Sequence, residues 1–426
     1  MQCARFRIGP RRLSLFTKTG EEKRLVNILG NTYPVDDFTN VTSKIVSYVG
    51  RSLHNNEFHP LCLTKQKIIH YFYSSFKTSR GNPQFSVYDS LNPVVSVLDN
   101  FDSLLIPKNH VSRNRSECYY INRDQLLRAH TTAHQSYLIK MGLDNFIIFG
   151  DVYRRDEIDS THFPVFHQSD AVRLYNETQL KSLTGNKVGI LENRRKEESV
   201  DKQAEYTLEV TKIVEDQLKS TLVGLVKTLF GNDINCRWVD VYFPFTHPSW
   251  ELEIQWNGTW IEVLGCGVMR HAILQNAGVE DRIGWAFGIG LERIAMLLYE
   301  IPDIRLFWSN DSGFINQFKN KTPQDVFKYK PVSVYPQCIN DISFWLSDKE
   351  SFVANDFFEM IREIGGDLIE QVYLVDDFTH PKTSKRSLCY RIVYRHLDRT
   401  LTQKEVNQVH KLIEEKATAQ FGVIIR

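Results

Sequence analysis

One strand–loop–strand stretch gathers side chains that suit an anionic ligand. It contains adjacent arginines at Arg154 and Arg155, histidines at His162 and His167, and the amide Gln168. Each of these, taken singly, could be an exposed loop residue. Together they favour a binding site, because a guanidinium group at a strand end binds phosphate through paired donors. An aromatic ring on the returning strand could also stack on a base.

A second stretch, Ala286–Arg293, reads Ala-Phe-Gly-Ile-Gly-Leu-Glu-Arg. Gly288 and Gly290 allow a ligand to approach the backbone closely. We expect a helix to follow, with Arg293 one turn into it. The same pattern also fits a buried glycine turn with a surface arginine, so its meaning depends on the first stretch.

Two common nucleotide-binding patterns are missing from the chain: the Gly-x4-Gly-Lys-Ser/Thr loop, and Gly-x-Gly-x-x-Gly at the start of a βαβ unit. His130 and His134 have the spacing of zinc ligands on a helix. Thr131, however, stands where a His-Glu-x-x-His site has its glutamate. We therefore expect neither a P-loop nor a zinc site of this type.

The elements around the first stretch read as strands. Phe146–Tyr153 and Val165–Tyr175 are strand-like runs separated by a polar loop, and Trp250–Leu264 alternates around Asn257-Gly258, a two-residue type I′ turn. Hairpin-joined strands with helices around them predict an antiparallel sheet rather than a Rossmann sheet.

Ahead of Ala286–Arg293, helices are expected in four places: from Thr39 through apolar positions up to Leu53, over Thr64–Phe76, over 122–140 starting at Asn122, and in a long helix that ends at Phe230 before Gly231. We expect residues 176–202 to form a polar surface excursion.

The last hundred residues have an order of their own. A Lys-, Thr- and Pro-rich boundary near 320–331 is followed by a predicted strand, helix, strand, strand, helix and strand, with Thr402 and Glu405 as a capping box at the second helix. The order βαββαβ is that of a ferredoxin-like sandwich. We predict an α+β protein with domains at 31–320 and 331–426, joined by a linker at 321–330.

Bulk composition excludes several classes of protein. The chain has 426 residues, 42% of them hydrophobic and 24% charged, with a net charge of +1. No apolar run approaches the roughly 18–20 residues that cross a bilayer. RNA binding would have to come from local patches, since no overall basic field exists. The seven cysteines are scattered, which fits a reducing compartment and argues against a zinc ribbon or a disulfide scaffold.

The first twenty residues contain Arg5, Arg7, Arg11, Arg12 and Lys18, with no acid before Glu21. This composition is typical of a mitochondrial targeting peptide, and a disordered basic tail is the alternative. We predict a leader and linker over residues 1–30 and a location in the mitochondrial matrix.

Taken together, the two stretches resemble motifs 2 and 3 of class II aminoacyl-tRNA synthetases. Pro93 is either the motif 1 proline or a simple turn. The resemblance extends to the mitochondrial single-chain form of phenylalanyl-tRNA synthetase and covers roughly residue 30 to the end. It is carried by Asn100-Phe-Asp-Ser-Leu-Leu-Ile-Pro107, Leu127-Arg-Ala-His-Thr131, Val152-Tyr-Arg-Arg-Asp156, Phe166-His-Gln168, Tyr242-Phe-Pro-Phe-Thr246, Leu264-Gly-Cys-Gly-Val-Met269, Ala286–Arg293 and Ile301-Pro-Asp-Ile-Arg305.

The resemblance implies a class II antiparallel catalytic sheet flanked by helices, and an anticodon-binding C-terminal domain. It also implies roles for individual residues. The residues implied in catalysis are Arg154, His162 and Arg293. Those implied in phenylalanine binding are His130, Thr132, Ala133, His134, Gln135, Gln168, Ser169, Asp170, Phe243, Phe245, Ala286, Phe287 and Gly288. Those implied in ATP binding are Arg154, Thr161, His162, Phe163, Phe166, Glu262 and Arg293, with Glu262 also near Mg²⁺.

Some of these residues have plain structural alternatives. Phe243, Phe245 and Phe287 could be core aromatics, and His162 a loop histidine. Glu262 alternates with Trp260 and Leu264, so we expect it to point the way apolar residues point. An unpaired carboxylate in such a place would be costly, which favours a role facing the ligand.

Three positions depart from the family pattern: Thr132 stands where Ser is usual, Asp170 where Glu is usual, and Val111 where Pro is usual. The first two bear on substrate affinity. The expected reaction is activation of phenylalanine by ATP and Mg²⁺, followed by transfer to tRNA(Phe) by a monomeric enzyme. Lys382, Lys385, Arg386, Arg391 and Arg395 are the candidate tRNA contacts, and a solvated face is their alternative.

Two other functions remain open at this point. One is an inactive paralogue that binds tRNA as a regulator, which the loss of Arg154 or Arg293 would have favoured. The other is a ligase that charges a small molecule or a protein, against which the anticodon-type domain argues.

Overall fold

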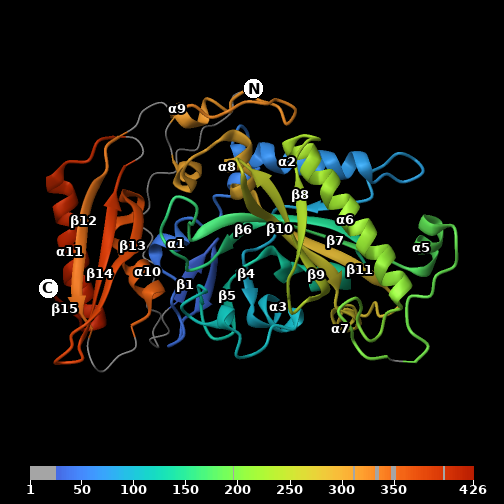
Figure 1. Ribbon diagram of the computed structural model, residues 1–426, viewed down its shortest axis with the longest axis horizontal. Coiled ribbons are helices and arrows are strands. Elements are labelled where there is room, and N and C mark those ends of the chain that lie inside the picture. Colours follow the sequence, from blue (N-terminus) through green and yellow to red (C-terminus); the bar gives the residue numbers. More distant parts are fainter. Residues whose placement is uncertain (1–24, 195, 310–311, 332–334, 347–351, 397–398) are drawn as a thin grey trace.

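The computed structural model describes residues 25–194, 196–309, 312–331, 335–346, 352–396 and 399–426 (Figure 1). Most of the expected leader, residues 1–24, lies outside this described part. Within the remainder of the 1–30 segment, Leu25–Ile28 forms β1, which pairs with β2 (Asn31–Pro34). The folded structure therefore begins inside the 1–30 segment that the sequence assigned to a leader and linker.

A seven-stranded sheet forms the centre of the larger domain (Figure 1). All neighbouring strands are antiparallel except β3 and β6. The strands, in spatial order, are β3 (Ser86–Tyr88), β6 (Asn145–Tyr153), β7 (Val165–Tyr175), β11 (Ile283–Gly290), β10 (Thr259–Met269), β9 (Thr246–Trp256) and β8 (Cys236–Asp240). The expected antiparallel class II sheet is confirmed.

Helices cover both faces of this sheet. Three helices pack on one face around a core that includes Phe72, Leu218 and Trp285: α2 (Pro60–Ser75), α6 (Leu208–Phe230) and α8 (Leu291–Tyr299). Two short helices pack on the opposite face, together with Phe146 and Ile148 of β6: α4 (Gln135–Lys140) and α7 (His271–Asn276). The remaining elements of the domain are α1 (Ser43–Val46), β4 (Val94–Ser96), α3 (Val97–Asn100), β5 (Gln125–Leu127), α5 (Glu177–Thr184) and α9 (Ser312–Ile315).

Several local predictions are confirmed. The β9–β10 hairpin turns at Asn257 and Gly258, whose φ angles of 49° and 83° are those of a type I′ turn. The helix α6 ends where Gly231 takes a φ of 100°. Residues 176–202 contain α5, capped by Asn176 through a capping box, and otherwise irregular structure.

Two helix predictions were wrong. The expected helix over 122–140 is instead the strand β5, a short 3₁₀ turn and α4, because Leu126 and Leu127 are buried by pairing with β4. The side chain of Asn122 accepts hydrogen bonds from the backbone of Asp124 and Gln125, which closes a turn. The expected helix from Thr39 is reduced to the single turn α1, which Thr42 caps.

The smaller domain has the predicted βαββαβ order. Its elements are β12 (Cys338–Trp345), α10 (Ala354–Gly365), β13 (Ile369–Thr379), β14 (Arg386–Tyr394), α11 (Gln403–Phe421) and β15 (Ile424–Ile425), with the sheet order β13-β14-β12-β15. It has its own core around Phe344, Phe357 and Tyr390. Thr402 and Glu405 form the expected capping box.

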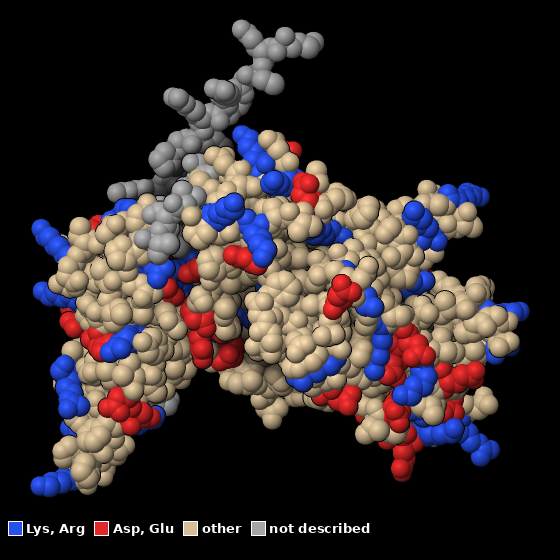
Figure 2. Space-filling model, turned by 45° about the horizontal axis from the view of Figure 1, so that its top comes forward, with Lys and Arg blue, Asp and Glu red and all other residues tan. Residues whose placement is uncertain are grey.

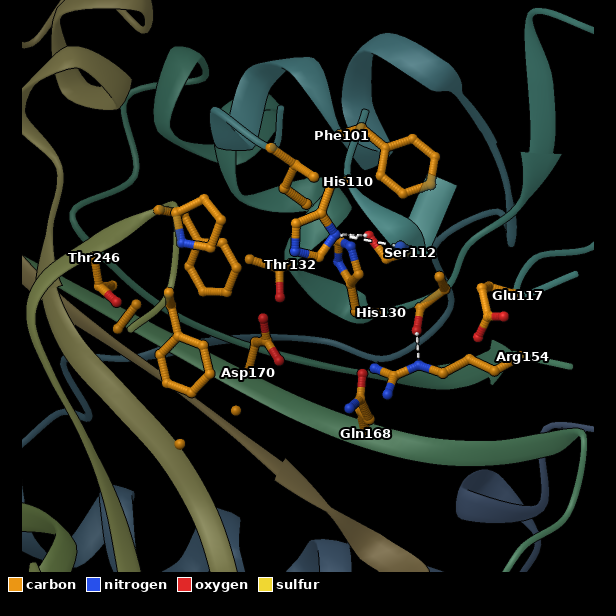
Figure 3. A pocket seen from close by; sticks show the side chains of 18 of the residues that line it. Phe101, His110, Ser112, Glu117, His130, Thr132, Arg154, Gln168, Asp170 and Thr246 are labelled. Atoms are coloured by element: carbon orange, nitrogen blue, oxygen red, sulfur yellow. Dashed lines mark hydrogen bonds between the residues drawn. The ribbon is translucent and has the colours of Figure 1, made fainter. Parts of the chain in front are cut away.

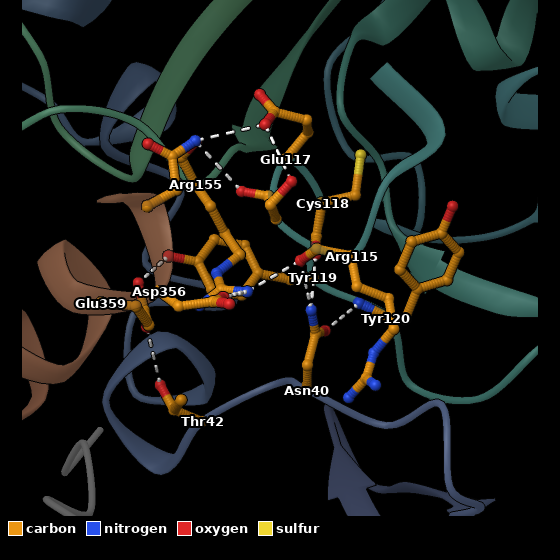
Figure 4. A network of polar contacts seen from close by, with 12 residues as sticks. Asn40, Thr42, Arg115, Glu117, Cys118, Tyr119, Tyr120, Arg155, Asp356 and Glu359 are labelled. Atoms are coloured by element: carbon orange, nitrogen blue, oxygen red, sulfur yellow. Dashed lines mark hydrogen bonds and ion pairs between the residues drawn. The ribbon is translucent and has the colours of Figure 1, made fainter. Parts of the chain in front are cut away.

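The two domains meet along α10 (Figure 4). Glu359 accepts hydrogen bonds from the Tyr119 hydroxyl at 2.6 Å and from Arg362 at 2.8 Å, and all three side chains are buried. The backbone N–H of Val372 in β13 donates to the carbonyl of Ile158 at 2.9 Å. The loop between β6 and β7 thus contacts the smaller domain on one side and the strands that carry the candidate ligand-binding residues on the other.

Candidate active site

A cavity of about 650 Å³ opens on the side of the sheet that α4 and α7 cover (Figure 3). This volume is typical of a site for a small organic ligand. The cavity collects side chains from β7, β9, β10 and β11 and from the segments 101–135, 154–156 and 242–246. The lining residues that the sequence predicted are His130, Thr132, Gln135, Arg154, Gln168, Asp170, Phe243, Phe245, Glu262, Ala286, Phe287 and Gly288.

The strand β7 supplies one row of polar groups. Because side chains alternate along a strand, Phe166, Gln168 and Asp170 share one face, while His167 and Ser169 are buried on the other. The Oε1 atom of Gln168 is buried and has no hydrogen-bond partner among the described residues. An amide oxygen left unpaired beside a cavity is ready to accept a hydrogen bond from a ligand.

Asp170 is the buried acid of this row and is only 2% exposed. Its carboxylate accepts hydrogen bonds from the Thr131 hydroxyl at 2.8 Å and from Gln135 Nε2 at 3.1 Å. Burial raises the pKa of Asp170 to about 6, and the side-chain hydrogen bonds of Thr132, Thr131 and Gln135 limit the rise. A buried carboxylate in this position can bind a cationic group.

Arg154 follows the last residue of β6. Its Nε donates to the carbonyl of Ala129 at 2.7 Å, and its guanidinium carbon lies 5.2 Å from the centre of the Phe166 ring. In Figure 3 the guanidinium group points towards Gln168, with its terminal nitrogens facing the cavity. The backbone contact holds the stem of Arg154, which leaves the terminal donors for a ligand.

Aromatic and small residues form the opposite wall. The rings of Phe243 and Phe245 are stacked, with centres 5.6 Å apart and planes 8° apart. Gly265 lies directly beneath Phe243: a Cβ atom there would come within 2.9 Å of the ring. Gly288 is similarly close to Asp170, at 3.1 Å from Oδ1. Small residues at these two positions keep room for the ring and the acid.

The residues expected at the phosphates lie at the outer side. Arg293 Nη1 donates to the carbonyl of Glu262 at 3.1 Å and lies 3.4 Å from its Oε2. His162 Nδ1 lies 2.7 Å from Asp159 Oδ2, and this hydrogen bond raises the pKa of His162. Thr161 also donates to Asp159. Of these residues, only Glu262 lines the cavity.

Glu262 does not point with Leu264 as the alternation predicted. The β9–β10 register shifts between Glu262 and Leu264, so Leu264 enters the core while Glu262 stays exposed beside Arg293. The bulge adds a residue to one strand and reverses the face of the next side chain.

Eight of the predicted residues are not part of the cavity wall. Four lie on the phosphate side, namely Thr161, His162, Phe166 and Arg293, and the other four are Ala133, His134, Phe163 and Ser169. Phe163 packs against Trp308, with ring centres 5.5 Å apart, and Ala133 is buried in a separate small core. His134 Nε2 lies 2.9 Å from Arg128 Nη1, within a buried network in which Arg128 also pairs with Asp151 at 2.6 Å. Ser169 is buried on the far face of β7.

Two findings from known proteins bear on this arrangement. Residues 44–207 and 194–318 match the family of tRNA synthetases class II core domain (F), and residues 333–426 match the ferredoxin-fold anticodon binding domain. The chain is 55% identical, over 94% of its length and 92% of the relative's, to the probable mitochondrial phenylalanine–tRNA ligase of Drosophila melanogaster. It is 51% identical to the mitochondrial enzyme of Mus musculus (95% and 89% covered) and 38% identical to that of Saccharomyces cerevisiae (94% and 95% covered).

The chain belongs to the mitochondrial phenylalanine–tRNA ligase family. It is accordingly an aminoacyl-tRNA synthetase with a class II catalytic core and an anticodon-binding domain.

Sequence reasoning missed part of the ligase's cavity wall. The further lining residues include Phe101, His110, Glu117, Cys118, Tyr242, Glu251 and Cys266. Glu251 could have been found, since in β9 it stands opposite Gly265 of β10 and so faces the same cavity. Cys266 is in β10 next to Gly265. The others come from irregular segments, where no periodic pattern indicates the direction of a side chain.

His130 and His134, which have the spacing of zinc ligands, are uncharged in the structure. Burial lowers the pKa of His130 and of His134 to about 3 each, so the imidazoles are neutral at physiological pH. Within the described residues no cluster of three or more His, Cys, Asp and Glu is arranged to hold a metal ion.

None of the described helices is long and apolar enough for a membrane span.

Proposed function

We propose that this phenylalanine–tRNA ligase activates phenylalanine with ATP in the 650 Å³ cavity and then esterifies tRNA(Phe). One observation carries the proposal: a buried acid, Asp170, and an unpaired amide oxygen, Gln168 Oε1, stand on one strand opposite the stacked rings of Phe243 and Phe245. An amino group and an aromatic ring of one ligand fit this pair of walls.

The α-ammonium group of phenylalanine binds the carboxylate of Asp170 and the amide oxygen of Gln168. Charge-assisted hydrogen bonds of this kind are about twice as strong as neutral ones. Asp170 has a shorter side chain than the glutamate that the family pattern has. The Thr131 and Gln135 hydrogen bonds fix its oxygens, so the ammonium group, not the acid, adjusts its position.

The ring of the substrate packs against Phe243 and Phe245, with Ala286, Phe287 and Gly288 at its end. Aromatic pairs of this type add about 0.5–1.5 kcal/mol beyond their buried area. Thr132 and His130 border the same space. A wall of this composition selects an aromatic side chain over an aliphatic or a charged one.

Activation places the substrate carboxylate beside Arg154. One carboxylate oxygen attacks the α-phosphorus of ATP; the new O–P bond forms as the bond from that phosphorus to the bridging oxygen breaks, and pyrophosphate leaves with the electron pair. Arg154 neutralises charge on the α-phosphoryl oxygens, and no protein nucleophile is required. Phe166 stacks on adenine, while Arg293 and His162 bind the outer phosphates.

Mg²⁺ fits the outer side of the site. The ion is commonly held by one or two carboxylates together with substrate phosphates, and Glu251 and Glu262 both line the cavity. Burial, and then the neighbouring charges of Glu262 and Glu253, raise the pKa of Glu251. A cation bound between Glu251 and Glu262 would offset this repulsion. When bound, Mg²⁺ supplies charge neutralisation to the departing pyrophosphate.

The smaller domain binds the anticodon region of tRNA. Of the candidate contacts, Arg386 pairs with Asp377, Arg391 with Asp341, and Arg395 with Glu370, at 2.6–2.8 Å. Lys382 and Lys385 lie in the exposed loop between β13 and β14, without an ion-pair partner among the described residues. The two lysines are therefore the first phosphate contacts, because the arginines would have to release a carboxylate first.

The ligase acts as a monomer in the mitochondrial matrix. The inactive regulatory paralogue is the alternative, and the presence of both Arg154 and Arg293 disfavours it. Figure 2 shows Lys and Arg interspersed with Asp and Glu over the face in view, in keeping with a net charge of +1, so tRNA recognition depends on local groups.

The deciding experiment is ATP–pyrophosphate exchange with each of the twenty amino acids, without tRNA, using protein that lacks residues 1–24. Exchange that depends chiefly on phenylalanine supports the proposal. Exchange with none of them, in protein that binds tRNA, would establish the regulatory paralogue instead.

A further inference from the structure

A single carboxylate joins the strand that carries Phe166 and Gln168 to the helix that carries Arg293. Glu292 Oε2 accepts the backbone N–H of His167 at 2.7 Å, and Glu292 Oε1 lies 2.6 Å from Nδ1 of the same histidine. With its proton on Nδ1, the ring donates this second bond. His167 is 0% exposed and Glu292 3% exposed, so both bonds are shielded from water.

The backbone geometry explains why a side chain is needed here. The pairing of β7 with β11 ends at Gln168 opposite Gly290, and the chain then turns into α8 at Leu291. The next backbone N–H on that side of β7, at His167, has no strand partner left. The carboxylate of Glu292 takes the place of a carbonyl and extends the ladder by one residue, which avoids an unpaired buried donor.

His167 itself cannot touch a ligand in the cavity. Its ring is on the opposite face of β7, 5.1 Å from the ring of His54 and 5.8 Å from that of Trp308, between centres. Of its two sequence neighbours, Gln168 lines the cavity, and Phe166 lies on the same face of β7 with its ring 5.2 Å from the guanidinium carbon of Arg154. Glu292 likewise immediately precedes Arg293, whose side chain crosses to Glu262 on β10. The pair is therefore adjacent to three ligand-facing residues without being one of them.

We propose that Glu292 and His167 are positioning residues for ATP: their paired hydrogen bonds set the separation between Phe166, which supports the adenine, and Arg293, which binds the terminal phosphate. The inference rests on the proposed function of this site. The two residues assigned to the ammonium group, Gln168 and Asp170, lie further along β7, where the ladder to β11 pairs them with Gly290 and Gly288. The hydrogen bonds between Glu292 and His167 therefore position the ATP-binding residues and leave the phenylalanine-binding residues in place.

The test compares His167→Ala, His167→Asn and Glu292→Gln by ATP–pyrophosphate exchange, with ATP and phenylalanine varied separately. For His167→Ala we expect kcat/KM for ATP to fall about 10- to 100-fold, the effect of displacing reacting groups by about 1 Å, while KM for phenylalanine changes less than about twofold. His167→Asn keeps an N–H donor near the position of Nδ1 and should recover most of the loss. Glu292→Gln keeps one hydrogen-bond acceptor, so its kcat/KM for ATP should lie between those of His167→Ala and His167→Asn.

The matched control is Glu215→Gln. Glu215 is a buried carboxyl of α6 that pairs with Lys212 and Lys219, on the same side of the sheet but away from the cavity. Glu215→Gln should lower stability but should not change KM for ATP relative to KM for phenylalanine. Calorimetric binding of phenylalanine alone, retained in each variant, checks that the site has folded.

Parallel changes in both KM values, unchanged ATP kinetics, or no recovery in His167→Asn would overturn the positioning role. The proposed function is tested separately by the unaltered chain: absence of phenylalanine-dependent exchange there removes both ideas, whereas exchange with parallel changes in the variants removes only this one.

Discussion

The Thr131 hydroxyl donates a 2.8 Å hydrogen bond to Oδ1 of Asp170, from a turn that precedes α4 to a carboxylate in the middle of β7. This bond and the one from Gln135 hold the acid in a site that burial makes unfavourable for charge. The expected partner of the charge is the substrate's ammonium group. Two consequences follow for pH and for stability.

Phenylalanine activation should weaken in acid. The pKa of Asp170 in the empty site is about 6, so the carboxylate that binds the ammonium group is lost as the pH falls through 6. We expect kcat/KM for phenylalanine to fall about tenfold per pH unit below that value. Asp170→Asn should have a low kcat/KM for phenylalanine at every pH, without the decrease below pH 6. A wild-type profile that stays flat to pH 5 would contradict the assignment.

The same group should make the empty enzyme less stable at neutral pH. The folded-state pKa lies above the value of 3.8 for an exposed aspartate, so the folded state favours the protonated form. Its destabilising effect is complete above pH 6 and disappears as the pH falls towards 4. Asp170→Asn should therefore raise the free energy of unfolding at pH 8 by up to about 3 kcal/mol and hardly change it at pH 4. Urea unfolding at both pH values measures this; equal effects at both would refute it.

Gly150→Ala should destabilise the catalytic domain. A Cβ atom at Gly150 would lie 2.3 Å from Nη2 of Arg128, which is 1% exposed and pairs with Asp151. Breaking a buried pair of this kind costs about 3–5 kcal/mol. Gly189→Ala, at an exposed glycine with open space around it, is the control and should change stability by less than about 0.5 kcal/mol. Similar melting temperatures for the two variants would argue against the clash.

Gly265→Ala should impair phenylalanine binding through Phe243. The added methyl would meet the ring at 2.9 Å, and the ring must then move into the substrate's space. We expect KM for phenylalanine to rise about tenfold, in line with the 1–3 kcal/mol of an overpacked contact, with KM for ATP unchanged. Adding Phe243→Leu should recover part of the loss in a double-mutant cycle. Additive effects would mean that the two positions do not interact.

Replacing Lys382 and Lys385 with alanine should raise KM for tRNA and flatten its dependence on salt, because two phosphate contacts are removed. Phenylalanine-dependent exchange without tRNA should be unaffected. Arg391→Ala is the matched control, since Arg391 already binds both oxygens of Asp341, at 2.7 and 2.8 Å. A larger effect from Arg391 than from the two lysines would reverse the proposed order of contacts.

Local sequence signals determined much of the framework. The β9–β10 hairpin follows from alternation around Asn257 and Gly258, and the end of α6 from Gly231, because turn and cap residues act over a few positions. The βαββαβ domain was predictable for the same reason. The helix expected from Asn122 failed because Leu126 and Leu127 pair with a strand some thirty residues earlier, and no local pattern records such a partner.

The sequence by itself also identified the chemistry, since the arginines, the acid and the aromatic pair appear as residue types in recognisable motifs. Only the tertiary structure decided how they act together. It showed that Thr131 as well as Gln135 holds Asp170, that Arg128 fills the space above Gly150, and that Glu292 reaches His167. These contacts join residues up to 125 positions apart. They depend on strand register and side-chain direction, which are set by the packing of the whole domain.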